Sequence, residues 1–364
     1  MDEGKEIYSD VIDYIFHAQG TYILAINSNI YKSEKGSLEF VVETKDARKI
    51  LNYDYNSILI LDSLNKPTIL NLISKNKKSL HPIDDFRVSS INEKFIFFYT
   101  KKPKRNNGVY DRKKQKIIFM SDKPIRDFIF EDKIISILNG VISLLHLENN
   151  SLLWEQDLSQ MGSYVSGLFN RNSQRGEIKK IIGVYNNKII VYLTGWMILG
   201  INLITGEIDI NISSKNHVFQ NPELNSSVLE DLYNIFIDQN KEIVYVFQGR
   251  KYIEISLKEQ EIIKVKDFEN DFSYKGLYIK HAIKTDDNIF FSAMRRETWK
   301  LDSSTNKVGY TNVDSLGQFN LETNDIEWLK PFNLGETFLT DKLKTFNNKI
   351  GVTDNKDHLH IIKT

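Results

Sequence analysis

The chain has 364 residues, of which 41% are hydrophobic and 12% aromatic, so it is long enough to bury a substantial core in one or two domains. Basic and acidic residues number 48 each, which leaves no net charge to attract the whole chain to nucleic acid or to an anionic membrane. The absence of cysteine excludes disulfides, thiol catalysis and cysteine-ligated metal centres.

The amino-terminal stretch, MDEGKEIYSDVIDYIF, lacks the basic-then-apolar pattern of a signal peptide, and no apolar run in the chain reaches membrane-spanning length. We therefore expect a cytoplasmic protein, and a periplasmic or surface location only if a leader was removed. Frequent lysine, isoleucine and asparagine are typical of a bacterial genome of low GC content.

A polar turn followed by a short apolar strand recurs along the chain, as hairpins require. Eight such strands begin at Gly20, Asn56, Lys94, Lys133, Lys188, Lys241, Asn288 and Lys349. The intervals run from 36 residues (Gly20 to Asn56) to 61 residues (Asn288 to Lys349). A period near 40 residues with four short strands in each unit is typical of a β-propeller blade.

A second mark follows most of these strands, four residues beyond a turn like that of Gly206 in INLITGEIDI. An aromatic residue occupies this register at Phe40, Phe119, Trp154, Tyr310 and Trp328, whereas Ile210 and Lys264 are exceptions. We expect the aromatic side chain, at the start of each outer strand, to wedge into the neighbouring blade.

These marks predict an all-β fold, a single propeller domain over residues 1–364 with eight four-stranded antiparallel blades. Seven blades are the alternative count, and a β-sandwich is the alternative fold. The last unit, 340–364, lacks its outermost strand, and residues 6–12 precede the first complete blade. Pairing of 6–12 with that last blade would close the ring and remove exposed strand edges.

The segments INLITGEIDI, HLENNSLLWEQDL, KLDSSTNKVGY and FNLETNDIEWLKPF resemble the repeats of quinoprotein-type (PQQ-like) and WD40-like propellers. That resemblance implies a fold and no particular activity, because the superfamily includes dehydrogenases, scaffolds and partner-binding domains. Its quinone enzymes are typically exported and hold calcium beside the cofactor, and many have a vicinal cysteine pair. This sequence shows neither a leader nor a cysteine, so we expect no quinone or other cofactor here.

The spacing of the two marks assigns the hairpin at 299–310 to the seventh blade, which leaves the similar hairpin Gln318–Trp328 as surplus. Long connections are expected mostly between one blade and the next, at Ser159–Glu177, Asn211–Glu230, Asp267–Leu277 and Thr311–Leu339. By strand direction they emerge on the same face as the connections between second and third strands. Loops on a rigid scaffold often carry function.

Arginine and aromatic residues, which dominate protein-binding hot spots, are frequent in these loops. The run TKKPKRNNGVYDRKKQK at 100–116 adds eight bases against one acid. The candidate partner-binding residues are Lys101, Lys102, Lys104, Arg105, Tyr164, Phe169, Arg171, Arg175, Trp196, Phe219, Phe272, Tyr274, Arg295 and Arg296. The alternative interpretation of the basic run is a solvated hairpin. The alternative interpretation of the arginine and aromatic residues is that they pack within their own loops.

The sequence contains no glycine-rich phosphate loop, HExxH, calcium loop or nucleophile elbow. His358 and His360 share a face of an expected strand and could bind a metal, but we interpret them as surface histidines. The expected function is therefore non-catalytic: a scaffold, or an inhibitor, for example of a toxin, that binds another protein. A hydrolase or lyase with an axial site for a sugar or lactone is the alternative, and nucleic-acid binding through 100–116 is weaker still.

Overall fold

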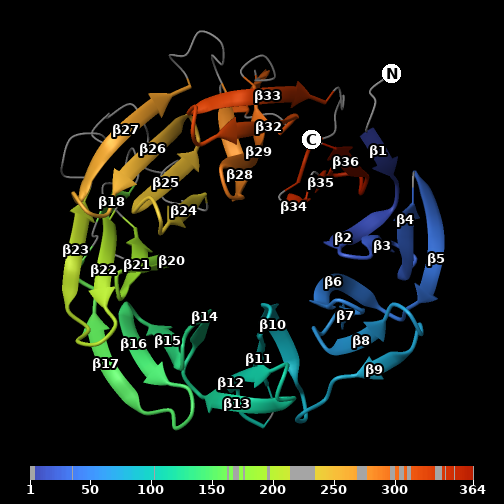
Figure 1. Ribbon diagram of the computed structural model, residues 1–364, viewed down its shortest axis with the longest axis horizontal. Helices are drawn as coiled ribbons and strands as arrows, with labels where there is room; N and C mark the ends of the chain where they lie inside the picture. The colour runs from blue at the N-terminus through green and yellow to red at the C-terminus, as the bar shows by residue number, and fades with distance from the viewer. Residues whose placement is uncertain are drawn as a thin grey trace. The chain divides into compact units, whose positions relative to one another are not determined.

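The computed structural model describes residues 5–34, 36–101, 103–161, 164–166, 172–174, 177–194, 197–213, 234–268, 277–295, 300–302, 307–309, 313–332, 338–340, 342–347 and 349–363. Every regular element in these ranges is a β-strand (Figure 1). The chain divides into two compact units, Met1–Asp122 with Lys280–Thr364, and Lys123–Ile279.

The first unit contains five four-stranded antiparallel sheets, the fourth of which begins at the boundary between the units. The first three sheets consist of β2 (Val11–His17), β3 (Gly20–Ala25), β4 (Asn29–Glu34) and β5 (Ser37–Glu43); β6 (Ala47–Asp54), β7 (Ser57–Asp62), β8 (Pro67–Asn71) and β9 (Lys77–Ser79); and β10 (Arg87–Ile91), β11 (Phe95–Tyr99), β12 (Asn107–Asp111) and β13 (Lys116–Ser121). The other two consist of β28 (Tyr278–Lys284), β29 (Asn288–Met294), β32 (Ser315–Asn320) and β33 (Asp325–Pro331); and β34 (Lys344–Phe346), β35 (Lys349–Thr353), β36 (Leu359–Lys363) and β1 (Lys5–Tyr8).

The second unit contains three four-stranded sheets of the same kind. They consist of β14 (Ile125–Phe130), β15 (Lys133–Leu138), β16 (Val141–His146) and β17 (Leu152–Asp157); β20 (Ile178–Tyr185), β21 (Lys188–Leu193), β22 (Met197–Asn202) and β23 (Ile208–Ser213); and β24 (Ile235–Asp238), β25 (Ile243–Gln248), β26 (Lys251–Ser256) and β27 (Glu261–Asp267). Two further hairpins pair β18 (Tyr164–Ser166) with β19 (Asn172–Gln174) and, in the first unit, β30 (Lys300–Asp302) with β31 (Lys307–Gly309).

Each of the eight polar-turn marks in the sequence lies at the start of the second strand of one sheet or within two residues before it, from β3 at Gly20 to β35 at Lys349. The predicted eight blades and the predicted pairing of the chain's ends are both confirmed. Strand β1 pairs antiparallel with β36, with Lys5 opposite Ile362 and Tyr8 opposite Leu359, and Figure 1 shows it as the outer strand of that sheet. The strand is Lys5–Tyr8 rather than 6–12, because Val11 already begins β2.

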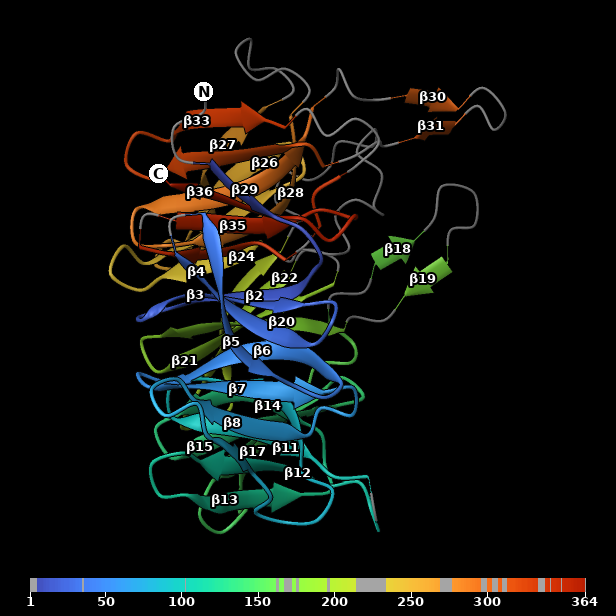
Figure 2. The ribbon, with the colours of Figure 1, turned by 90° about the vertical axis from the view of Figure 1, so that its right-hand side faces the viewer.

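The assignment of the seventh blade was wrong. Strand β29 pairs with β32, which includes Gln318, and β32 pairs with β33, which includes Trp328. The hairpin predicted to be surplus therefore completes the sheet. The hairpin at 300–309 is the insertion, and Figure 2 shows β30 and β31 away from β29 and β33. Strand pairing distinguishes the two hairpins, because β32 pairs with β29 and buries Leu316 and Phe319, whereas β30 pairs with β31.

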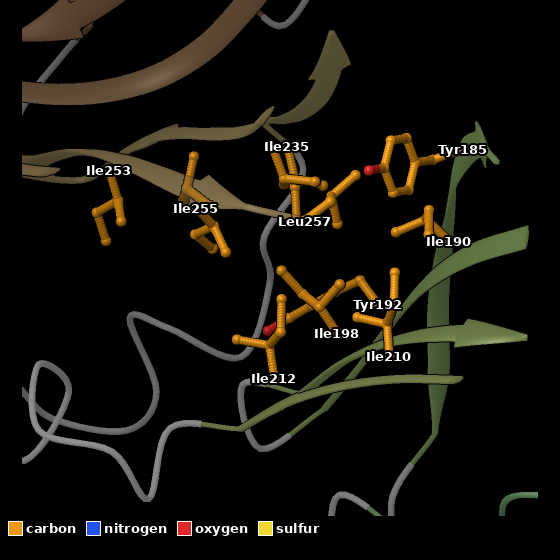
Figure 3. Close-up of a cluster of buried hydrophobic side chains, with 12 residues drawn as sticks. Tyr185, Ile190, Tyr192, Ile198, Ile210, Ile212, Ile235, Ile253, Ile255 and Leu257 are labelled. Carbon is orange, nitrogen blue, oxygen red and sulfur yellow. The ribbon is translucent and has the colours of Figure 1, made fainter. Parts of the chain in front are cut away.

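The core consists of layers between successive sheets of each unit. In the second unit, Ile190 and Ile210 from one sheet pack with Ile235, Ile255 and their neighbours in the next sheet (Figure 3). In the first unit, one such layer joins β2–β5 to β6–β9, which run side by side in Figure 2. A four-stranded sheet cannot bury both of its faces alone, so the repeated apolar strands are explained by this stacking.

The aromatic wedge predicted for the outer strands is present in some sheets only. Trp154 of β17 is 8% exposed, and its indole N–H donates to the carbonyl oxygen of Leu203 in the next sheet, at 3.1 Å. A Cβ atom added to Gly206 would lie 2.9 Å from the same indole, so glycine permits this close approach. Phe40 of β5, by contrast, is 51% exposed and forms no wedge. Tyr310 lies outside the described residues.

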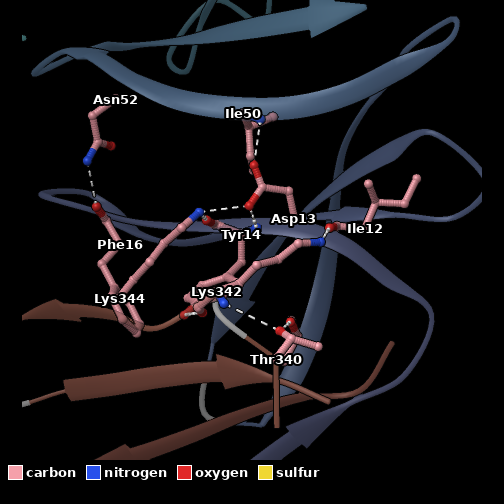
Figure 4. A network of polar contacts seen from close by, with 10 residues as sticks. Ile12, Asp13, Tyr14, Phe16, Ile50, Asn52, Thr340, Lys342 and Lys344 are labelled. Carbon is pink, nitrogen blue, oxygen red and sulfur yellow. Dashed lines mark hydrogen bonds and ion pairs between the residues drawn. The ribbon is translucent and has the colours of Figure 1, made fainter. Parts of the chain in front are cut away.

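A polar network joins the innermost strands of three sheets in the first unit (Figure 4). The Asp13 carboxylate accepts hydrogen bonds from the backbone N–H of Ile50, at 3.0 Å, and from that of Tyr14, at 2.9 Å. It also forms an ion pair with the Lys344 ammonium at 2.7 Å. The carboxylate thus holds β2, β6 and β34 together.

Candidate partner-binding edge

In every sheet, the connection from second to third strand and the connection from the fourth strand to the next sheet leave from the same end, because neighbouring strands are antiparallel. We call this end the loop edge of the sheet. The second unit has its longest connections at loop edges, between β17 and β20, β23 and β24, and β27 and β28. In the first unit, the longest one joins β29 to β32 rather than spanning Thr311–Leu339, because of the hairpin insertion.

Most of the predicted partner-binding residues lie outside the described residues: Lys102, Phe169, Arg171, Arg175, Trp196, Phe219, Phe272, Tyr274 and Arg296. For Tyr164 the structure describes the backbone only, which pairs with Gln174 in the β18–β19 hairpin. The side chains of Lys101, Lys104, Arg105 and Arg295 are described, and all four belong to loop-edge connections of the first unit.

The connection between β11 and β12 is a compact loop. The buried Thr100 donates its backbone N–H to the carbonyl oxygen of Asn106 at 2.9 Å and its hydroxyl to that of Lys104 at 3.0 Å. The backbone N–H of Lys101 donates to Asp85 at 2.7 Å, and Asp85 forms a part-buried ion pair with Arg87. The loop is therefore anchored at its base and at its first residue.

The cationic side chains of this loop face solvent. Lys101 and Arg105 are exposed, and the Arg105 guanidinium lies 5.9 Å from the centroid of the Tyr99 ring. The Lys104 ammonium lies 3.0 Å from Asp122, but both side chains are more than half exposed. Such a surface pair contributes little to stability, so Lys104 can exchange Asp122 for a partner at small cost.

The basic run 100–116 does not form one patch. Strand β12 separates Lys101, Lys104 and Arg105, at the loop edge, from Arg112 and the following lysines, at the opposite end of the sheet. The Arg112 guanidinium donates to the carbonyl oxygens of Asn92 and Glu93, at 2.6 and 2.7 Å, and stacks on Tyr53. Arg112 therefore supports the fold, and only the first part of the run belongs to the candidate surface.

Arg295 stands at the base of the inserted hairpin between β29 and β32. Its guanidinium donates to both oxygens of Asp314, at 3.4 and 3.1 Å, and the Asp314 carboxylate also accepts the Ser315 hydroxyl at 2.7 Å. The pair joins the two ends of the insertion. Arg295 thus positions the insertion, and its partly exposed side chain is less available to a partner than those of Lys101 and Lys104.

A similar clamp in the second unit joins the start of β20 to the end of β21. The backbone N–H of Thr194 donates to the carbonyl oxygen of Glu177 at 2.9 Å, and the backbone N–H of Glu177 donates to the Thr194 hydroxyl at 2.8 Å. These bonds tie the residue before β20 to the end of β21. The connections that contain Trp196 and the β18–β19 hairpin therefore begin from a fixed base.

The interpretation of both His358 and His360 as surface histidines was wrong for His360, which is 3% exposed. Both rings lie 3.0 Å from the Asp354 carboxylate, which also accepts the backbone N–H groups of Lys356 and His358. Burial raises the pKa of Asp354, but the hydrogen bonds from His360 and His358 outweigh it, so this pKa lies below its ordinary value. The sequence signal that could have indicated this arrangement is Asp354, four residues before His358, because an aspartate at such a position often accepts backbone N–H groups of a turn.

Among the described residues of the innermost strands of the first unit, Asp13 is the only buried carboxylate. Its ion pair with Lys344 and the hydrogen bonds that it accepts from two backbone N–H groups explain its burial. Within the same residues, no cluster of three or more histidine, aspartate or glutamate side chains has a geometry suited to a metal ion. No helix among them is long and apolar enough to cross a membrane.

A set of basic side chains that the sequence analysis missed lies between the first two sheets. Lys45 follows β5, Lys66 precedes β8, and Lys77 begins β9, and all three line one cavity. No local motif could have revealed this cluster, because it depends on how two successive sheets stack.

No protein-family model matches the chain, and no curated protein matches it. Solved structures do. BamB from Moraxella catarrhalis is similar at 10% identity over 99% of this chain and 98% of its own, with a TM-score of 0.54. Sqt1 from Saccharomyces cerevisiae is similar at 9% identity over 100% and 97%, with a TM-score of 0.58.

The C-terminal WD40 domain of Sif2 is similar at 10% identity over 98% of this chain and 97% of its own, with a TM-score of 0.58. At such low identities these likenesses show the fold alone. With eight four-stranded antiparallel sheets, the chain has the β-propeller fold that its repeats predicted, and these propeller structures are similar to it in fold.

Proposed function

We propose that the chain is a non-catalytic binding module that presents loop-edge residues to a partner protein, as a scaffold or as an inhibitor, for example of a toxin, in the cytoplasm. The observation that carries the proposal is the β11–β12 loop. It holds exposed cationic side chains on a backbone fixed by Thr100 and by the Asp85–Arg87 pair. A fixed loop loses little conformational entropy when it binds, which favours affinity.

The predicted aromatic residues of the loop edges would supply the apolar centre of the interface, and the lysines its polar rim. Rim charges mainly raise the association rate and select the partner's charge. Since Lys101, Lys104 and Arg105 face solvent together, the proposed partner carries carboxylates opposite them.

The test uses the two ends of β12 as matched surfaces. One variant carries Lys101→Glu, Lys104→Glu and Arg105→Glu, and the control carries Lys113→Glu, Lys114→Glu and Lys116→Glu. Both change three basic residues to acids on the same hairpin, so their net charges are equal. Affinity capture from native lysate with quantitative mass spectrometry should show partners lost in the first variant and kept in the second. Equal capture by both variants would refute a partner surface at this loop.

A further inference from the structure

A cavity of about 530 Å³ opens at the loop edge between the sheets β2–β5 and β6–β9. Its walls come from the residues after β5, the turn between β7 and β8, and strand β9. Ile60 and Pro67, both buried, provide an apolar floor. A concave site of this size with an apolar floor and a few polar groups suits a small molecule.

The cavity is positively charged, since three lysines, Lys45, Lys66 and Lys77, line it with one carboxylate, Asp62. Among the described residues neither Lys45 nor Lys66 forms an ion pair. The Lys77 ammonium donates to the carbonyl oxygen of Glu43, which is a neutral acceptor and leaves its charge uncompensated. Three positive charges against one negative charge leave an excess of two.

Asp62 has a local role that explains its presence there. One of its carboxylate oxygens accepts the backbone N–H groups of Leu64 and Lys66, both at 2.8 Å, and so closes the turn between β7 and β8. This turn places Lys66 at the cavity wall. The aspartate is therefore part of the support for the basic residues rather than the group that neutralises them.

Hydroxyl groups complete the lining. Thr68 of β8 lies opposite Ser79 of β9 in the strand pairing, so their side chains share one face of the sheet. Neither hydroxyl has a hydrogen-bond partner among the described residues, and both line the cavity. His81 adds a further nitrogen at the rim. Hydroxyl and ammonium donors around a net charge of this sign are suited to the oxygens of an anion.

We propose that this cavity binds a small phosphate monoester of about the size of a sugar phosphate. A phosphate monoester carries about −1.5 to −2 charges near pH 7, which matches the excess charge, whereas a single carboxylate would leave one lysine unpaired. Lys45, Lys66 and Lys77 surround the phosphate, and the hydroxyls of Thr68 and Ser79 donate to its oxygens. The proposal does not depend on the partner-binding function.

Isothermal titration calorimetry with ribose 5-phosphate tests the proposal, with ribose, inorganic phosphate and citrate as comparison ligands. We expect ribose 5-phosphate to bind, ribose not to bind, and the other two to bind more weakly. The double variant Lys45→Gln/Lys66→Gln should lower the affinity at least about tenfold, since charge-assisted hydrogen bonds are the strong ones. Thr68→Val, which removes a hydroxyl and keeps every charge, should weaken binding by a few fold.

The control variant Lys113→Gln/Lys258→Gln removes the same charge from turns between third and fourth strands and should bind like the unchanged protein. Several results would overturn the proposal: no binding of ribose 5-phosphate, tighter binding of citrate, binding of inorganic phosphate as tight as that of ribose 5-phosphate, or equal losses in the two double variants. The last result would mean that the overall charge, and no particular cavity, attracts the anion.

Discussion

Strand β1 offers a sharp test, because two of its neighbouring residues point to opposite faces of the last sheet. Tyr8 is 5% exposed and packs in a cluster with Val11, Tyr14 and Leu359, whereas Ile7 is 54% exposed. If β1 completes that sheet, truncation of Tyr8 must destabilise the protein much more than truncation of Ile7. A detached amino-terminal strand would make both truncations nearly neutral.

The magnitudes follow from the buried area. Replacing Tyr8 by alanine removes about 130 Å² of buried aromatic surface, and at about 25 cal/mol per Å² the loss is about 3 kcal/mol. The Tyr8 hydroxyl also donates to Glu6 at 2.8 Å, so a small further loss is expected. For Ile7→Ala the expected loss is about 0.5 kcal/mol, because half of that side chain is already in water.

Urea unfolding followed by tryptophan fluorescence measures both variants on one scale. A loss of about 3 kcal/mol is a large share of the 5–15 kcal/mol typical of folded domains, so the midpoint should fall clearly. Equal midpoints for Tyr8→Ala and Ile7→Ala, or a larger shift for Ile7→Ala, would refute the pairing of β1 with β36.

Three further predictions concern packing and charge. A Cβ atom on Gly317 would lie 2.4 Å from the Phe291 ring, so Gly317→Ala should lower the free energy of unfolding by about 2 kcal/mol in urea, and an unchanged value would contradict this close packing. Lys344→Met leaves the buried Asp13 carboxylate without its counter-ion and should lower the free energy of unfolding by about 3 kcal/mol, while the double variant Asp13→Asn/Lys344→Met should lose less. Thermal unfolding compares the two variants, and a larger loss in the double variant would contradict the pairing. Because the pKa of Asp354 is lowered in the folded state, its contribution to stability is present above about pH 4 and disappears as the pH falls through the folded-state pKa. An Asp354→Asn variant lacks this contribution and is already destabilised, so its acid unfolding should begin at higher pH. Identical acid unfolding curves for the two proteins would contradict this role.

The repeat itself could be predicted because its signal is local. A polar turn followed by β-branched residues, as at Lys188 or Lys349, needs no knowledge of distant contacts, and each mark lies at the start of a second strand or within two residues before it. The pairing of β1 with β36 followed from counting the strands of the last unit. Here the sequence pattern and the topology carry the same information.

The failures involve contacts between distant residues. The hairpins at 299–310 and 318–328 resemble each other locally, and the pairing of β32 with β29 distinguishes them. Phe40 and Trp154 occupy the same register, but only Trp154 meets a glycine turn in the next sheet. The cavity that Lys45 lines combines residues from two sheets. No single stretch of sequence records such proximity.

Hydrogen–deuterium exchange with mass spectrometry on the protein, with and without a captured partner, tests most directly whether binding occurs at the loop edge. The two connections that flank β12 provide the comparison within one hairpin. We predict slower exchange on partner binding in residues 100–106 and unchanged exchange in residues 112–115. Slower exchange in 112–115, with residues 100–106 unaffected, would contradict the proposed partner surface.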